Sequence, residues 1–128
     1  MAKEAIKTPS APAAVGPYSQ AIRNGGWLFL SGQIGLAPTG GSLVAGGVEA
    51  EARQIMRNIA AILSAAGAST SDICKTTIYL TDLADFALVN QVYEEAIEAP
   101  LPARSTVQVA GLPLGAKVEI EVIAHAPH

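Results

Sequence analysis

The balance between helix and strand patterns constrains the fold of this chain more than any other feature of its sequence. From Val48 to Ala66, apolar residues recur at steps of three and four, which indicates an amphipathic helix, and Gly67 follows at the position of a left-handed cap. A second helical spacing starts at Asp85 and has to stop by Pro100. Strand patterns occur in five segments of the remaining sequence, at residues 20–23, 27–31, 73–81, 102–109 and 117–122.

This balance leaves part of the predicted sheet uncovered. Two helices cannot cover both faces of a sheet of five or six strands, so one face needs another partner. Of the 128 residues, 50% are hydrophobic and 15% are charged, against roughly 25% charged residues in typical globular proteins. We therefore expect one domain over residues 1–128, with 1–10 as a lead-in and 125–128 as a tail, that self-associates through the uncovered face.

Two turns predict how the strands pair. Asn24-Gly25-Gly26 between two apolar segments is typical of a hairpin. Residues 107–109 and 117–122 alternate at period two around a Gly/Pro turn, which predicts a second, antiparallel hairpin. If the apolar side chains share a face, Val107 and Val109 lie with Val118, Ile120 and Val122. The opposite face then carries Arg104, Thr106, Gln108, Glu119 and Glu121.

Charge and hydropathy argue against several classes of partner. The net charge is −3, and the eight lysines and arginines form no basic cluster, which disfavours nucleic-acid binding. Residues 1–6 lack the apolar stretch of a signal peptide, and no segment approaches the roughly 18 apolar residues of a membrane span. We expect a soluble, cytoplasmic protein with no nucleic-acid or membrane partner.

The chain offers few ligands for a metal or cofactor. Cys74 is the only cysteine, which excludes an intrachain disulfide, and its apolar strand predicts a buried, unreactive thiol. His125 and His128 lie in the tail, where a frayed terminus is the preferred interpretation over a metal site. The glycine pairs at 40–41 and 46–47 lack the Lys-Ser/Thr of a phosphate loop and are interpreted as loop glycines. We expect no metal and no cofactor.

Arg104, Glu119 and Glu121 are the charged residues that suggest chemistry. The planar guanidinium of Arg104 can bind a carboxylate through two hydrogen bonds, although a salt bridge to Glu121, worth at most about 1 kcal/mol if exposed, is the alternative. A partly desolvated carboxylate such as Glu119 can hold a water molecule and accept its proton. Glu121 has the same parity as Glu119, and a solvated strand face is the alternative for both.

These segments also carry a family resemblance that runs from about residue 11 to residue 124. The chain resembles the YjgF/RidA family of small enamine/imine deaminases, also known as the endoribonuclease L-PSP family. The matching segments, in the family's order, are Gly16-Pro17-Tyr18-Ser19-Gln20, Ser31-Gly32-Gln33-Ile34, Lys75 to Leu80, Asn90, Pro102 to Thr106 and Val118 to Glu121. The resemblance implies a chorismate-mutase-like α+β fold with a mixed sheet, two helices on one face, and a homotrimer whose sheets form a central barrel with clefts between subunits.

The resemblance also implies a function and its residues. It implies cofactor-independent hydrolysis of reactive 2-enamine and 2-imino acids, such as 2-iminopropanoate and 2-iminobutanoate, to 2-keto acids and ammonia. Arg104 would orient the substrate carboxylate, and Glu119, the first glutamate of Glu-Ile-Glu, would orient water. The predicted substrate-binding residues are Tyr18, Ser31, Gly32, Asn90 and Thr106, the last at a position where many family members have cysteine.

Each of these five residues also has a plain structural interpretation. Tyr18 could anchor a turn, Ser31 and Gly32 could simply end a strand, and Asn90 could face water. Two alternative functions also remain: a ligand-binding or chaperone-like trimer without turnover, and a ribonuclease, which ranks last because the chain has no pair of catalytic histidines and no basic face.

The predicted hairpin register separates the two catalytic candidates. Aligning Val109 with Val118 places Arg104 opposite Ile123, four residues from Glu119, which is about 13 Å along the strand. This distance is too large for both side chains to contact a substrate of three or four carbons. We therefore expect each site to combine Arg104 of one subunit with Glu119 of its neighbour.

Overall fold

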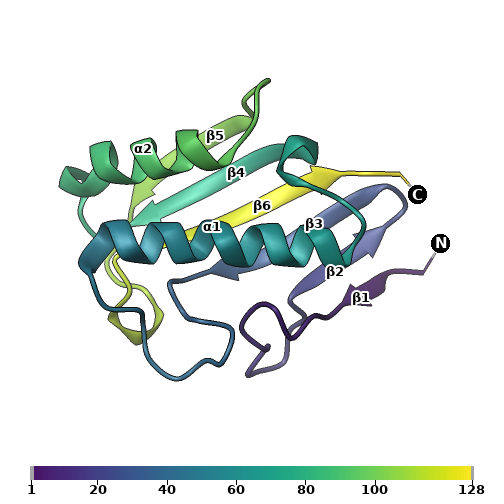
Figure 1. Ribbon diagram of the computed structural model, residues 1–128, viewed down its shortest axis with the longest axis horizontal. Helices are drawn as coiled ribbons and strands as arrows, with labels where there is room; N and C mark the ends of the chain where they lie inside the picture. The colour runs from purple at the N-terminus through teal and green to yellow at the C-terminus, as the bar shows by residue number, and fades with distance from the viewer. Residues whose placement is uncertain (1, 128) are drawn as a thin grey trace.

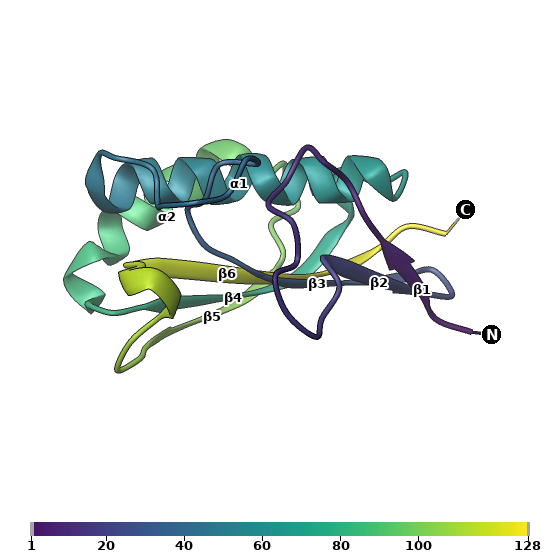
Figure 2. The same cartoon turned by 90° about the horizontal axis from the view of Figure 1, so that it is seen from below.

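The protein has two layers, a mixed β-sheet and two helices that pack on one face of it (Figures 1 and 2). The structure, a computed structural model, describes residues 2–127. Within them the strands are β1 (Glu4–Ile6), β2 (Ala21–Asn24), β3 (Trp27–Gln33), β4 (Ile73–Leu80), β5 (Ala103–Gln108) and β6 (Val118–His125). The helices are α1 (Gly47–Ala65) and α2 (Phe86–Ala96), with single 3₁₀ turns at Thr70–Asp72, Leu83–Asp85 and Pro113–Gly115. The predicted single α+β domain is confirmed.

Local sequence signals account for most of these elements. β2 and β3 form the predicted hairpin, and Gly25 in its turn has a φ of 62°. α1 ends at the predicted cap, where Gly67 has a φ of 77°. α2 begins directly after Asp85 and ends before Pro100, as its spacing predicted. Strand β1, however, lies inside the segment expected to be a lead-in, where it pairs with β2 as an edge strand.

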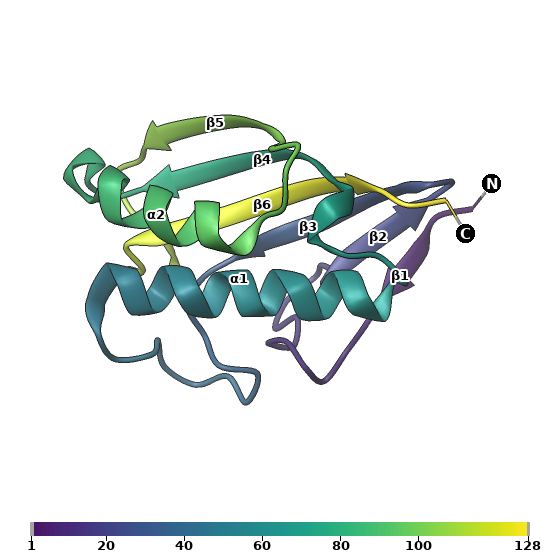
Figure 3. The same cartoon turned by 45° about the horizontal axis from the view of Figure 1, so that its top comes forward.

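The sheet order explains why both helices lie on the same side. The order is β1-β2-β3-β6-β4-β5, with β4 and β5 parallel and the other neighbours antiparallel. The crossovers β3–α1–β4 and β4–α2–β5 both advance towards the β5 edge (Figure 3). Because such crossovers are right-handed, both helices are placed on one face of the sheet. The expectation that the helices cover only one face is confirmed.

The predicted C-terminal hairpin is wrong. β5 and β6 are indeed strands, but β4 lies between them and pairs with β5 in parallel and with β6 in antiparallel orientation. The connection over residues 109–117 contains a 3₁₀ turn and is longer than the two to five residues usual in hairpins, so it can pass over β4. The alternation of apolar residues identified the strands but not their partners.

The predicted polar face is wrong for the same reason. Along β4, Thr76 is paired with Arg104, while Tyr79 is paired with Glu119. Thr76 points to the helices and Tyr79 to the open face, because neighbouring side chains of a strand alternate. Arg104, and with it Thr106 and Gln108, therefore lies on the helix face, whereas Glu119, Glu121 and Val107 lie on the open face.

The core lies between the helices and the sheet. Its largest fully buried apolar side chains are Leu28, Ile55, Ile59, Ile62, Leu63, Ile78, Leu80, Val89, Val118, Ile120 and Val122. On the other face of the sheet, by contrast, Trp27, Phe29 and Val107 are exposed. This open face has the apolar character that the sequence predicted for an association surface.

Two smaller predictions also fail. Cys74 is exposed rather than buried, because the pairing of β4 with β6 shifts register between Ile73 and Lys75 and turns Cys74 out of the core. His125 belongs to the end of β6, where its ring stacks edge-on against Trp27 with the ring centroids 4.7 Å apart. The expected tail therefore starts later, and its last residue, His128, lies outside the described residues. Across residues 2–127 no helix combines the length and hydropathy needed to cross a bilayer.

Candidate active site

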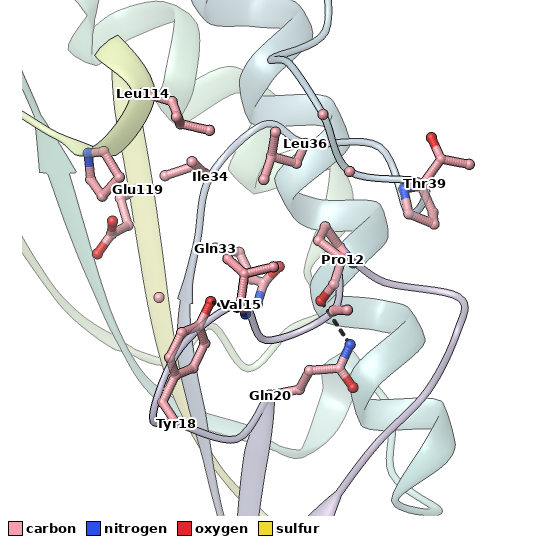
Figure 4. A pocket seen from close by; sticks show the side chains of 16 residues that line it. Pro12, Val15, Tyr18, Gln20, Gln33, Ile34, Leu36, Thr39, Leu114 and Glu119 are labelled. Atoms are coloured by element: carbon pink, nitrogen blue, oxygen red, sulfur yellow. Dashed lines mark hydrogen bonds between the residues drawn. The ribbon is translucent and has the colours of Figure 1, made fainter.

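Glu119 lies in an open cleft of about 610 Å³ that four parts of the chain enclose (Figure 4). The segment before β2 contributes Pro12, Val15 and Tyr18, the end of β3 contributes Gly32, and Ile34 follows that strand directly. The loop that follows β3 adds Leu36, Pro38 and Thr39, and the turn before β6 adds Pro113 and Leu114. The cleft is largely apolar, with the carboxylate of Glu119 on one side and the phenol of Tyr18 on another (Figure 4).

Gly32 leaves room for the Glu119 carboxylate close to the backbone at the end of β3. A Cβ at position 32 would lie 2.8 Å from Cδ and 3.1 Å from Cγ of Glu119, and closer still to Oε2. A Cβ here would therefore make the Glu119 side chain move from its observed position. Gly32 was predicted to bind substrate. In the structure it lies at the site, where the absence of a side chain leaves room for Glu119.

The surroundings of Glu119 favour its protonated form. The side chain is half-buried, and this desolvation raises the pKa of its carboxyl group above the ordinary value. The negative charge of Glu121, two residues along the same strand face, raises that pKa further. A carboxylate with a raised pKa accepts and returns protons more readily near neutral pH, which is the property required of a general base.

Gln20 and Ser31 hold the segment that carries Tyr18. The buried side chain of Gln20 accepts a hydrogen bond from the backbone N–H of Thr8 and donates to the carbonyls of Thr8, Ala11 and Pro12, at 2.7 to 3.3 Å. The hydroxyl of Ser31 donates to the carbonyl of Ser19 at 2.6 Å. Ser31, predicted to bind substrate, thus donates its hydroxyl proton to the backbone next to Tyr18.

Arg104 lies on the other side of the sheet, against α2. Its Nη1 donates to Oδ1 of Asn90 at 2.7 Å, and its guanidinium carbon lies 5.0 Å and 5.4 Å from the ring centroids of Tyr93 and Phe86. A depression of about 340 Å³ opens in front of it, lined also by Leu101 and Pro102. The guanidinium packs against two aromatic rings and donates one hydrogen bond, and together these contacts fix the orientation of its plane.

Arg104 has no carboxylate partner among residues 2–127, where the ion pairs are those of Arg53 with Glu49 and Glu95. The predicted alternative, a salt bridge to Glu121, is wrong, because Glu121 lies on the opposite face and accepts a hydrogen bond from the Tyr79 hydroxyl at 2.7 Å. The remaining N–H groups of Arg104 are therefore available to a carboxylate from outside the chain.

Thr106 follows Arg104 on the same face of β5. Its Oγ1 is buried and has no hydrogen-bond partner among the described residues. Nearby, the hydroxyls of Thr76 and Tyr93 are bonded to each other at 2.7 Å, and burial raises the pKa of the Tyr93 phenol. A buried, unpaired hydroxyl beside Arg104 can accept or donate a hydrogen bond to a ligand that the arginine binds.

Metal binding finds no support in this part of the chain, since no three His, Cys, Asp or Glu side chains among residues 2–127 form a group that could hold an ion. The polar groups at the candidate site are the guanidinium of Arg104, the carboxylate of Glu119 and the hydroxyls of Tyr18 and Thr106.

The comparison with known proteins identifies the family. The family described as Endoribonuclease L-PSP matches residues 8–126. The chain belongs to this family. It is 54% identical to "Reactive Intermediate Deaminase A, chloroplastic" of Arabidopsis thaliana, over 95% of this chain and 65% of that protein. It is 48% identical to the "2-iminobutanoate/2-iminopropanoate deaminase" of Mus musculus, over 95% of this chain and 90% of that protein.

Solved structures of the family share the fold. One of them is the crystal structure of Escherichia coli TdcF with bound serine, whose sequence is 46% identical to this chain. The alignment covers 95% of this chain and 98% of TdcF, with a TM-score of 0.89. The resemblance to the YjgF/RidA family is confirmed by the family match and by the two relatives named above.

The family's predicted residues form two groups in a single chain. Tyr18, Gly32 and Glu119 line one cleft, with Ser31 beside it, and Arg104, Asn90 and Thr106 lie together on the other face. The register along β4 places Arg104 and Glu119 three residues and two strands apart, or about 14 Å between their Cα atoms. Although the predicted register was wrong, the separation of the two side chains within one chain is present.

Sequence reasoning gave no role to Glu51, Gln54 and Asn58, which are buried polar residues of α1. The Glu51 carboxylate accepts a hydrogen bond from the backbone N–H of Lys117 at 2.9 Å, and Asn58 donates to the carbonyl of Leu36 at 2.9 Å. These bonds attach the turn before Glu119 and the loop after β3 to the helix. In the sequence, these three residues are spaced three and four apart beside the apolar stripe of the helix. This spacing indicates that they share one face of α1.

Proposed function

We propose that the chain is a cofactor-independent deaminase that hydrolyses reactive 2-enamine and 2-imino acids to 2-keto acids and ammonia. The observation that carries this proposal is Arg104, an oriented guanidinium with no carboxylate partner among residues 2–127. It suits a substrate that bears a carboxylate next to the reacting carbon. The name of the mouse relative, at 48% identity, and the serine bound by TdcF agree with a small carboxylate ligand.

The residues of the two groups divide the reaction between them. Arg104, oriented by Asn90, would bind the substrate carboxylate, and Thr106 would hydrogen-bond to the same end of the molecule. Glu119 would accept a proton from a water molecule as its oxygen attacks C2 of the protonated imine. The nitrogen of the resulting carbinolamine then receives this proton from Glu119 and leaves as ammonia. As it leaves, the C2 hydroxyl gives its remaining proton to the Glu119 carboxylate, which passes it to the ammonia, and C2 becomes the carbonyl carbon of the 2-keto acid.

We infer that the protein acts as a homotrimer in which Arg104 of one subunit meets Glu119 of the next. The two side chains lie on opposite faces of one sheet and their Cα atoms are about 14 Å apart, so a small substrate cannot contact both within a chain. The open face, with Trp27, Phe29 and Val107 exposed, supports burial between subunits. Light scattering across a size-exclusion peak tests the number of subunits, and a stable monomer would contradict the proposal.

The deaminase proposal is tested by measuring 2-keto acid and ammonia release from freshly generated 2-iminopropanoate and 2-iminobutanoate. We expect turnover that survives treatment with a chelator. Binding of a 2-keto acid without any ammonia release would instead favour a ligand-binding trimer. A cytoplasmic location stays a prediction, and fractionation of cells that express the protein tests it.

The shared site is tested by mixing subunits. Arg104→Ala trimers and Glu119→Gln trimers should each be nearly inactive, whereas exchange between them creates some clefts with both residues intact. Recovered activity after exchange, verified by native mass spectrometry, supports the shared site. Exchange without recovery would show that the two residues do not act across an interface.

A further inference from the structure

Leu114 has an unusual backbone conformation for its residue type. Its φ of 58° and ψ of 20° lie in the left-handed region, and within residues 2–127 it is the only non-glycine residue with positive φ. A leucine is disfavoured there because its Cβ approaches the neighbouring carbonyl oxygen, and glycine adopts the same conformation without that contact. Strained residues of this kind often occur at binding sites.

The side chain of Leu114 is exposed and lines the cleft of Glu119. It is 64% exposed, although it is a large apolar residue in a turn. It lines the cleft of Glu119, at the same end as Ile34 and Leu36 (Figure 4). The strained backbone thus presents an apolar side chain to the cleft instead of burying it in the core.

The proposed orientation of the substrate places its side chain at this apolar end of the cleft. In the proposed reaction the substrate carboxylate binds to Arg104 and C2 lies near Glu119, so the remaining substituent on C2, the side chain, extends along the cleft. The cleft volume of about 610 Å³ is within the roughly 300–1,000 Å³ usual for ligand sites. On the single chain, this cleft has space for side chains longer than the one or two carbons of 2-iminopropanoate and 2-iminobutanoate.

We propose that Leu114, with Ile34 and Leu36, forms the surface that binds the hydrocarbon side chain of the substrate, and that Leu114 determines specificity for branched aliphatic 2-imino acids. This inference rests on the proposed deaminase function. Leu114 does not contact the reacting atoms in this scheme. Its strained backbone is retained because a leucine at this position supplies apolar contact that a glycine cannot.

Two substitutions separate the side chain from the backbone strain. Leu114→Ala removes most of the side chain and keeps a Cβ in the left-handed conformation, whereas Leu114→Gly removes both. We expect both variants to lower kcat/KM for 2-imino-4-methylpentanoate by on the order of tenfold, the lower range for loss of apolar contact in a pocket. Both should leave kcat/KM for 2-iminopropanoate within about twofold, because its methyl group does not reach this surface.

Thermal unfolding checks the assignment of strain. We expect Leu114→Gly to melt about 3–5 °C above Leu114→Ala, since only glycine accepts the left-handed backbone freely. Leu83→Ala, at another exposed leucine outside the cleft, is the matched control and should change neither the substrate preference nor the activity.

The ratio of kcat/KM for the two substrates decides the inference. An unchanged ratio in both Leu114 variants would overturn it, even if the wild-type protein is an active deaminase. If the wild-type protein hydrolyses neither imine, the proposed function fails, and calorimetry with 4-methyl-2-oxopentanoate and pyruvate takes over as the readout. Equal weakening of both keto acids by Leu114→Gly, or no weakening of either, would then overturn the inference.

Discussion

Substitution of Gly32 by alanine tests the placement of Glu119 with the smallest possible change. The added methyl group would lie 2.8 Å from Cδ of Glu119, whereas ordinary contacts of a Cβ begin near 3.4 Å. The carboxyl carbon therefore has to move by about 0.6 Å, and Oε2, which is closer, by more. Glutamate can make this movement by rotating its side chain, at a cost of about 0.5–1.5 kcal/mol.

A displacement of this size matters for catalysis far more than for stability. A misplacement of about 1 Å in a reacting geometry can reduce a rate by about 100-fold. We expect Gly32→Ala to lower kcat/KM for 2-iminopropanoate by about 10- to 100-fold, while the melting temperature falls by less than about 5 °C, the shift for roughly 1 kcal/mol. Release of 2-keto acid from freshly generated imine measures the first quantity, and circular dichroism the second.

Gly111→Ala is the control for this experiment. A Cβ at Gly111 would meet no atom within 4 Å, and its φ is not positive, so alanine should be accepted there without loss of activity. Wild-type kcat/KM in Gly32→Ala would show that Glu119 does not need its observed position. The proposed role of Glu119 as the base would then be wrong.

Three further predictions address the rest of the site. Arg104→Lys should lower kcat/KM by more than about 100-fold with the fold intact, because lysine keeps the charge but loses the planar pair of donors, and steady-state kinetics at saturating and limiting imine would show it. Glu121→Gln should move the acid limb of the kcat/KM profile to lower pH, because removal of a neighbouring negative charge lowers the pKa of Glu119, and an unmoved limb would contradict that coupling. Gln20→Met removes the hydrogen-bond partner of the buried Ala11 carbonyl, at about 1–3 kcal/mol, and of part-buried backbone groups of Thr8 and Pro12, and should lower the melting temperature by several degrees in a thermal melt.

The sequence predicted the elements of this fold better than their partners. Periodicity identified α1, α2 and the strands from β2 to β6, because the burial of each face leaves a local pattern. The pairing of β5 with β4 depends on a long-range choice between neighbours that period-two alternation does not contain. Gly/Pro residues before β6 are compatible with both a hairpin and a longer connection, and the hairpin was wrongly preferred.

The candidate site shows the same division. The type and position of Arg104, Asn90 and Glu119 were available from the residues and the family resemblance, and the structure groups them in cavities on two faces. The supporting contacts were not available, because Gln20 and Glu51 act on backbone groups distant in sequence. Leu114 could not be recognised, since a left-handed leucine has no sequence signature.

The distinction between Glu119 and Glu121 follows from their tertiary neighbours rather than from their strand. Both carboxylates point to the same face of β6, so parity alone leaves them equivalent. Glu121 accepts a hydrogen bond from Tyr79 and thereby raises the pKa of that phenol, which makes this carboxylate part of the sheet's own hydrogen bonding. Glu119 instead lies over Gly32, half-buried at the edge of a cleft, and the charge of Glu121 beside it raises its pKa. Glu119 is thus suited to exchange protons with a ligand. Glu121, through its charge, sets the pH range in which Glu119 does so.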